Sequence, residues 1–281
     1  MLNGLWLNYL TKFNLSQKIW NVGMRDELKL YTWQTNLESI CLDNAAVVVL
    51  NTKITNPPSI VQHLWNKCKL RVTVDGGTNR WHQFAIDNHL EYKIPDLITG
   101  DFDSIIPNVL DKFVKLGSKT IHTPNQNETD FTKALKEIKK YTTDNNTNIN
   151  TVIVMVNMDI RIDHFLSNIN TLYKLKDQFS NIDVFLLGRN TLTWLLLKGN
   201  HRIHIPPTLR MFPEKNYIGI FPLGSACNHC TTNGLKWNIN GKMEMGGLIS
   251  SSNTNNGDSI IMVTNSSPIL WTMTLGFEYN F

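Results

Sequence analysis

The sequence predicts an α/β domain with a doubly wound, mostly parallel sheet, followed by an all-β sandwich domain. Between residues 45 and 187, apolar runs rich in β-branched residues alternate with segments of helical period, which is typical of a parallel sheet with crossover helices. After about residue 188, short strand-like runs are separated by Gly, Asn, Pro and Ser, the pattern of an antiparallel sandwich or barrel. We expect an N-terminal extension over 1–40, the α/β domain over 41–190 and the sandwich domain over 191–281.

The first half reads as regular elements. Ala45–Asn51 is a continuous apolar run, as expected of a strand buried on both faces. Ser59–Lys67 follows two prolines and begins on a capping serine, so it predicts a helix. Further strands are expected at Leu70–Asp75, Leu97-Ile98, Lys119–His122, Val152–Val156 and Asp183–Leu187, and further helices at Thr78–Asn88, Pro107–Leu116, Thr129–Tyr141 and Asp163–Phe179.

The second half shows no convincing helical period. Its strands are expected at Thr191–Leu197, His201–Ile205, Tyr217–Pro222, Gly234–Asn238, Gly247–Ser252, Ser259–Val263 and Ile269–Leu275.

Residues 1–20 are apolar with two lysines and no acid, which weakly suggests a targeting presequence, but an extra helix or a loose tail is the preferred interpretation of 1–40.

Composition excludes several classes of function. The 281 residues carry a net charge of +4, which suits an anionic substrate such as a nucleotide. The sequence contains no stripe of Lys and Arg, so nucleic-acid binding is not predicted. No apolar run approaches the roughly 18 residues that a membrane span needs. The four cysteines come without a secretory signal peptide, so we expect a cytoplasmic protein without a disulfide scaffold.

Carboxylates follow two of the predicted strands and open a predicted helix. Asp101 and Asp103 come after Leu97-Ile98 and Gly100, and in extended backbone they would point the same way. Asp75 follows another strand, and open α/β sheets bind ligands at this edge. Together with Asp130 at the helix start, these groups would repel one another unless a cation lay between them. We therefore predict a magnesium site, with ordinary turns and a helix cap as the alternative.

Two further groups could contact substrate. Arg161 and Asp163 follow the strand Val152–Val156, where an arginine can bind a phosphate in a bidentate way. An exposed Trp237 would offer a surface for a planar cationic heterocycle, core packing being the alternative. Because the sequence has neither a P-loop nor a dinucleotide-binding motif, a bound nucleotide would depend on the acids and magnesium.

The ordered set of motifs between residues 45 and 275 resembles that of the thiamine pyrophosphokinase family. GDFDS and TDFTKAL are quite specific, and the complete order is very specific. The matching pieces are HLWNK (63–67), DGGTNR (75–80), GDFDS (100–104), TPNQNETDFTKAL (123–135), RIDH (161–164), INTL (169–172), GLKWN (234–238), LISSSNT (248–254) and LWTM (270–273).

The resemblance implies an enzyme that transfers a pyrophosphoryl group from ATP to the hydroxyl of thiamine, giving thiamine diphosphate and AMP. It implies a homodimer with sites between the subunits, Mg²⁺ as cofactor, and thiamine held by residues of the partner. By resemblance, Asp75, Asp101, Asp103 and Asp130 surround the metal and the ATP phosphates. The substrate-binding candidates are Asn79, Gln126, Thr129, Arg161, Asp163, Trp237, Ser250, Ser252 and Asn253.

One departure leaves alternatives open. The family usually has a turn of the form GGxxGR, whereas Asn157–Arg161 contains no glycine and adds Asp159. The close approach of this loop to phosphate is therefore in question. A metal-dependent phosphohydrolase and a non-catalytic nucleotide or thiamine binder are the competing interpretations.

Overall fold

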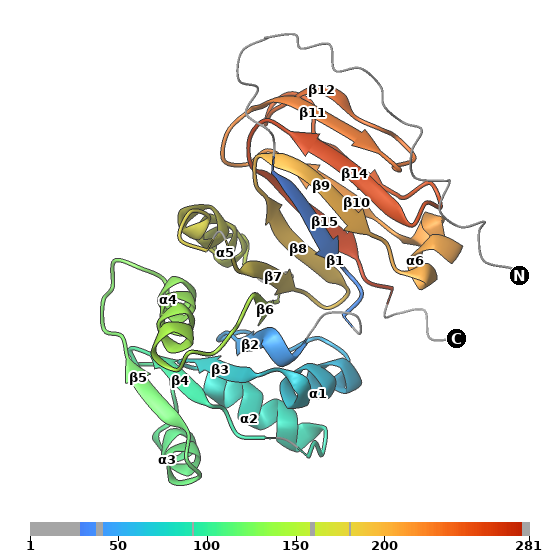
Figure 1. Ribbon diagram of the computed structural model, residues 1–281. Coiled ribbons are helices and arrows are strands. Elements are labelled where there is room, and N and C mark those ends of the chain that lie inside the picture. Colours follow the sequence, from blue (N-terminus) through green and yellow to red (C-terminus); the bar gives the residue numbers. More distant parts are fainter. Residues whose placement is uncertain (1–28, 38–41, 92, 158–160, 180, 277–281) are drawn as a thin grey trace, which may run out of the picture.

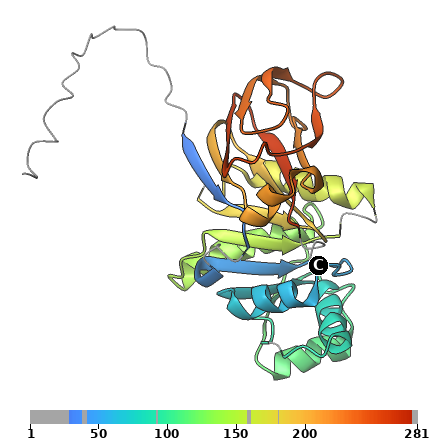
Figure 2. The same ribbon diagram turned by 90° about the vertical axis from the view of Figure 1, so that its right-hand side faces the viewer.

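The computed structural model describes residues 29–37, 42–91, 93–157, 161–179 and 181–276 (Figure 1). An α/β half and a β-rich half lie one above the other in this view, and Figure 2 shows the same two halves from the side. No helix within these residues is both long and apolar enough to cross a membrane.

The alternation predicted for the first half is confirmed. Six strands pair in parallel in the order β7-β6-β2-β3-β4-β5. The strands are β2 (Ala45–Val49), β3 (Leu70–Val74), β4 (Leu97–Gly100), β5 (Lys119–His122), β6 (Thr151–Met155) and β7 (Asp183–Leu187). The helices are η1 (Leu42–Asn44), α1 (Pro58–Lys67), α2 (Gly77–Asp87), α3 (Pro107–Lys115), α4 (Asp130–Asp144) and α5 (Ile162–Leu175).

Helices cover both faces of this parallel sheet. All five residues of β2 are buried, and they alternate between two apolar cores because successive side chains of a strand point to opposite faces. Val47 and Val49 join the core that contains residues of α1, α2 and α3, whereas Ala46 and Val48 join the core that contains α4 and α5. From β2 the chain continues outward through β3, β4 and β5, and it then returns to form β6 and β7 on the other side of β2. Ligands are expected at the carboxyl ends of the strands beside such a reversal.

The second half contains more strands than we predicted, together with a short α-helix and a short 3-10 helix. Gly234–Asn238 is not a strand; only Leu235 forms an isolated bridge there. The polar strands β11 and β12 and the helix α6 were not predicted. The elements are β8 (Thr191–Leu196), β9 (Gly199–His204), α6 (Pro207–Met211), η2 (Pro213–Lys215), β10 (Ile218–Phe221), β11 (Cys227–Asn233), β12 (Asn240–Met243), β13 (Ser250–Asn253), β14 (Ile260–Asn265) and β15 (Ile269–Thr274).

The two halves share one sheet. Strand β8 turns back after β7 and pairs with it in antiparallel fashion, through Leu186–Thr193 and Leu187–Leu192. The sheet continues through β15 and β10 to β13, so it has ten strands. The other sheet, in the order β1-β9-β14-β11-β12, shares an apolar core with it that includes Trp194 and Trp271.

The expectation of a helix or a loose tail is wrong for part of residues 1–40. Leu30–Gln34 forms β1 and pairs in parallel with β9 at the edge of the five-stranded sheet. Trp33 of β1 is 5% exposed and packs into the core shared by the two sheets. Residues 1–28, which include the suggested presequence, lie outside the described residues.

Candidate functional site

Asp75 follows β3 directly and is held in a constrained position. Its φ is +46°, and the residue is only 3% exposed. Its backbone N–H donates to Thr99 O at 2.7 Å. Gly100, at the end of β4, has a φ of +145°, and a Cβ there would lie 2.7 Å from Asp75 Cβ. A residue with a side chain at position 100 would therefore displace Asp75.

Asp101 and Asp103 are brought together, although not by the extended backbone that we predicted. Phe102 has a φ of +66°, so the chain turns at this residue, and Asp103 N donates to Asp101 Oδ1 at 3.4 Å. The Phe102 ring stacks on His122, with 5.4 Å between ring centroids. Ser104 Oγ donates to Asp103 Oδ1 at 2.7 Å, and Ser104 N donates to Asp75 Oδ1 at 3.3 Å. A tight turn fixes both carboxylates near Asp75.

Asp75, Asp101 and Asp103 form a three-carboxylate cluster, whose ligand oxygens all lie within 4.8 Å of one another. Three carboxylate oxygens at this spacing fit a hard divalent cation such as Mg²⁺, which prefers oxygen ligands. Gln126 Nε2 donates to Asp101 Oδ2 at 2.8 Å, and this hydrogen bond is the main reason why the pKa of Asp101 is lowered.

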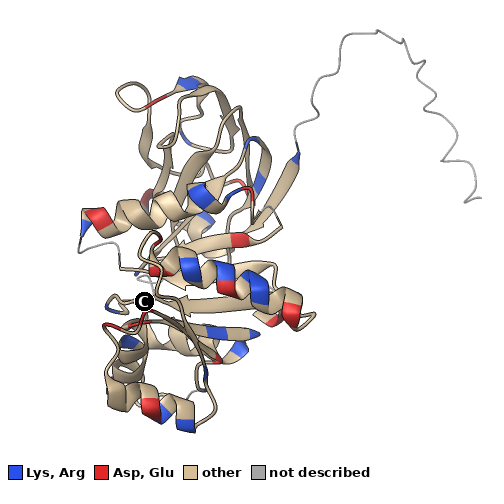
Figure 3. Ribbon diagram, turned by 90° about the vertical axis from the view of Figure 1, so that its left-hand side faces the viewer, with Lys and Arg blue, Asp and Glu red and all other residues tan. Residues whose placement is uncertain are grey.

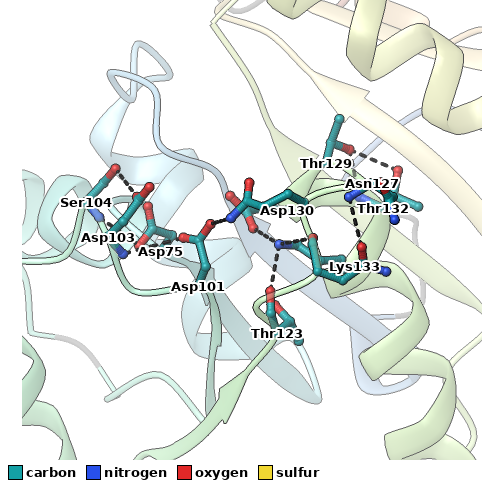
Figure 4. A network of polar contacts seen from close by, with 12 residues as sticks. Asp75, Asp101, Asp103, Ser104, Thr123, Asn127, Thr129, Asp130, Thr132 and Lys133 are labelled. Carbon is teal, nitrogen blue, oxygen red and sulfur yellow. Dashed lines mark hydrogen bonds and ion pairs between the residues drawn. The ribbon is translucent and has the colours of Figure 1, made fainter.

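Asp130 lies beside the cluster without being part of it (Figure 4). It is the first residue of α4 and forms an ion pair with Lys133 at 2.6 Å. Burial raises the pKa of Asp130, Lys133 opposes this shift, and the charges of Asp101 and Asp75 add to it. The fourth aspartate is therefore close enough to feel the cluster but has a cation of its own.

Asn79 and Thr129 bind other parts of the protein. Asn79 Nδ2 donates to Ser104 O at 2.8 Å, and its Oδ1 accepts from Ile106 N at 3.0 Å. This pair of bonds fixes the segment that follows Asp103. Thr129 is the N-cap of α4, and its hydroxyl accepts from Thr132 N at 3.1 Å, the capping alternative noted above.

Arg161 and Asp163 are paired with each other at the start of α5. Arg161 Nε donates to Asp163 Oδ1 at 3.0 Å, and a second ion-pair contact joins the same side chains. The two side chains are 61% and 60% exposed. No hydrogen bond or ion pair between described residues joins them to the cluster, and most of the altered loop, residues 158–160, lies outside the described part.

Trp237 is exposed, and a buried asparagine fixes its backbone. The residue is 57% exposed, and Lys236 Nζ lies 4.7 Å from the centre of its ring. Asn253, 2% exposed, accepts from Trp237 N at 3.2 Å and donates to Trp237 O at 2.8 Å and to Ser250 Oγ at 3.1 Å. Ser252 is exposed with a φ of +54°. Within the described residues, no hydrogen bond links this group to the aspartates.

The sequence did not identify Lys133 and Ser104 as part of the site. Ser104 lies in the motif GDFDS, and Lys133 lies in the motif TDFTKAL. Lys133 stands three residues after Asp130, a helical spacing that brings two side chains together, and this was the available signal. No comparable signal identified Ser104 as a donor to two carboxylates.

Two family models match the chain: the catalytic domain of thiamin pyrophosphokinase over residues 61–186, and the vitamin B1 binding domain of thiamin pyrophosphokinase over residues 200–270. Thiamine pyrophosphokinase 2 of Oryza sativa subsp. japonica is 36% identical over 241 residues, covering 82% of this chain and 86% of that protein. The chain belongs to the thiamin pyrophosphokinase family. The region matched to the catalytic domain of thiamin pyrophosphokinase contains all four aspartates, and the region matched to the vitamin B1 binding domain contains Trp237 and Asn253.

Further thiamin pyrophosphokinases show the same similarity. Thiamine pyrophosphokinase 2 of Arabidopsis thaliana is 35% identical over 252 residues, covering 85% of this chain and 89% of that protein. The structure of thiamin pyrophosphokinase from Candida albicans has a TM-score of 0.72 at 26% identity, covering 90% of this chain and 94% of that one. The yeast structure, at 22% identity and a TM-score of 0.75, shows the shared fold.

Proposed function

We propose that this chain catalyses the transfer of a pyrophosphoryl group from ATP to the hydroxyl of thiamine, which gives thiamine diphosphate and AMP. The observation that carries the proposal is the three-carboxylate cluster, whose oxygens lie within 4.8 Å of one another inside the region that matches the family's catalytic domain. Membership of the family supports the reaction, and the clustered acids supply the groups that a triphosphate substrate with its metal requires.

The cluster would hold Mg²⁺ through Asp75, Asp101 and Asp103, with Asp130 beside it. When bound, the metal neutralises charge on the transferred group and on the leaving AMP. Gln126 keeps Asp101 oriented, and Asn79 and Thr129 act through the backbone segments that they fix. An aspartate of the set, Asp101 or Asp130, accepts the proton of the thiamine hydroxyl as it attacks.

Thiamine would be bound by the β-rich half. The exposed ring of Trp237 suits stacking and cation–π contact with a cationic heterocycle, and Ser250, Ser252 and Asn253 adjoin it. In keeping with the homodimer that the family resemblance implies, we place the complete site between two subunits.

Each half of the chain is assigned one of the two substrates. We assign the nucleotide to a doubly wound domain over residues 41–190 and thiamine to a sandwich domain over 191–281, in a cytoplasmic enzyme. Arg161 and Asp163 are assigned to the ATP phosphates, which requires Arg161 to exchange its partner Asp163 for a phosphate.

The test is an assay of the purified protein with ATP, Mg²⁺ and thiamine. We expect AMP and thiamine diphosphate to form in equal amounts, and neither to form without thiamine. Release of inorganic phosphate that did not depend on thiamine would favour a phosphohydrolase. Binding of ATP or thiamine in calorimetry without turnover would favour a non-catalytic binder.

A further inference from the structure

Lys133 is a buried lysine surrounded by three oxygens. Its side chain is 7% exposed, and its Nζ lies 2.6 Å from Asp130 Oδ1. The same Nζ donates to Thr123 O at 2.7 Å and to Asn125 O at 3.2 Å. Two of the three N–H donors of the ammonium group therefore go to backbone carbonyls, and its charge is paired with Asp130. Buried among these oxygens, Lys133 does not present its charge to solvent.

The two carbonyls belong to the segment that connects β5 to α4. This connection is tied to the end of β4 by Thr123 N, which donates to Gly100 O at 2.7 Å. It also carries Gln126, whose Nε2 reaches Asp101 Oδ2 at 2.8 Å. Figure 4 shows Lys133 between Asp130 on one side and Thr123 on the other. Lys133 thus joins α4 to the segment that orients a member of the three-carboxylate cluster.

The position of Lys133 also matters for charge. Asp130 is half-buried next to Asp101 and Asp75, and neighbouring carboxylates repel one another. An ammonium group at 2.6 Å offsets this repulsion at Asp130. The rest of α4 carries three more lysines and two acids (Figure 3), but Lys136 on the next turn pairs with Glu128 and does not face the cluster.

We propose that Lys133 is a positioning residue for pyrophosphoryl transfer: it fixes the β5–α4 connection so that Gln126 holds Asp101, and it holds Asp130 beside the cluster. This inference rests on the proposed function. Lys133 acts through other residues and does not touch ATP or thiamine. Its loss should therefore lower kcat and weaken the response to Mg²⁺, while the KM for thiamine stays unchanged.

The test compares Lys133→Met with Lys136→Met, a matched control on the same helix. Methionine fills a similar volume without the charge. We expect Lys133→Met to lower kcat about a hundredfold, as small misplacements of reacting groups do, and to raise the Mg²⁺ concentration for half-maximal activity about tenfold. The thiamine KM should stay within about twofold, and Lys136→Met should change kcat by less than about threefold.

A double-mutant cycle with Gln126→Ala separates this role from general structural support. If Lys133 acts through the connection that carries Gln126, the double variant should be no slower than Lys133→Met alone. Fully additive losses in kcat would overturn the inference. A raised KM for ATP with unchanged kcat would also overturn it, because that result indicates direct contact with the nucleotide.

Lys133→Arg keeps the test decisive if Lys133→Met fails to fold. Arginine retains the charge but cannot reproduce the compact three-oxygen geometry, so we expect Mg²⁺ dependence near that of the wild type with kcat lowered about tenfold. Wild-type kcat in Lys133→Arg would overturn the positioning role. A wild-type chain that formed no AMP would overturn the proposed function itself, and the role of Lys133 with it.

Discussion

Two titratable groups near β1, the buried His201 and the exposed Asp183, should act against each other as the pH falls. His201 is fully buried on β9; its Nδ1 accepts from Trp33 Nε1 at 3.0 Å, and its Nε2 bonds Leu197 O at 2.8 Å. These partners fix the neutral ring, and burial lowers the pKa of His201 from 6.5 to about 4. Because the unfolded chain binds this proton first, stability is present above pH 6.5 and is lost as the pH falls toward 4.

Asp183, the first residue of β7, has the opposite effect. The residue is exposed, but partial desolvation of its carboxyl raises its pKa from 3.8 to about 6, so the folded chain binds this proton first and gains stability as the pH falls from 6 toward 3.8. Tyr31 of β1 connects the two groups, since its ring stacks on His201 at 4.9 Å and the charge of Asp183 contributes to its raised pKa.

The magnitudes follow from these pKa values, at about 1.4 kcal/mol per unit. Between about pH 7 and pH 5, His201 should remove about 2 kcal/mol of stability, whereas the exposed Asp183, screened by solvent, should add well under about 1 kcal/mol. In the wild type Asp183 therefore offsets only a small part of the loss from His201. Asp183→Asn should lose only slightly more stability than the wild type over this range, and His201→Gln about 2 kcal/mol less.

Urea unfolding followed by tryptophan fluorescence at the two pH values measures these differences. His204→Gln is the control substitution, because His204 lies on the same strand but is only half-buried. Comparing each variant with itself at two pH values removes any constant loss from the substitution. If His201→Gln responded to pH as the wild type does, the burial argument for His201 would be refuted.

Three further predictions concern the site. Asp103→Asn should lower kcat for AMP formation about a thousandfold, because it replaces a metal-ligand oxygen, with an unchanged urea midpoint; wild-type activity would show that Asp103 is not a ligand. Gly100→Ala should cost about 1–3 kcal/mol of folding free energy and also lower kcat, because its Cβ would strike Asp75. Gly257→Ala, also at positive φ but with nothing within 4 Å, should lose stability alone, and equal kcat losses would contradict the contact argument. Trp237→Ala should raise the thiamine KM about tenfold at constant ATP KM, and a parallel rise in both would count against stacking.

Local patterns explain why the first half of the fold could be predicted. Strands such as Ala45–Val49 are continuous apolar runs, and α4 begins after a capping Thr129, so both signals lie within a few residues. β11 and β12 are polar strands at one end of the five-stranded sheet, with the sequences CNHCTTN and NGKM. Their pairing depends on distant partners. β1 was missed for the same reason: its partner β9 lies about 170 residues away.

The site was predicted in part, and for partly incorrect reasons. The rule that parallel strands end at one edge correctly predicted that Asp75 would meet Asp101 and Asp103. The extended geometry assumed for Phe102 was wrong: its φ is positive, and its ring stacks on His122. Lys133 was not singled out from the sequence, because burial of its ammonium group depends on a loop that only the fold brings to it.

The ten-stranded sheet limits how this protein can move. Its backbone ladder runs without a break from β5 to β13, so the halves cannot swing about a linker as two tethered bodies would. Substrate entry then depends on rearrangement of loops or, in the proposed homodimer, on displacement of one subunit against the other. The same continuity predicts a single cooperative unfolding transition. Cutting the chain between β7 and β8 should leave two fragments that each expose an unpaired edge strand.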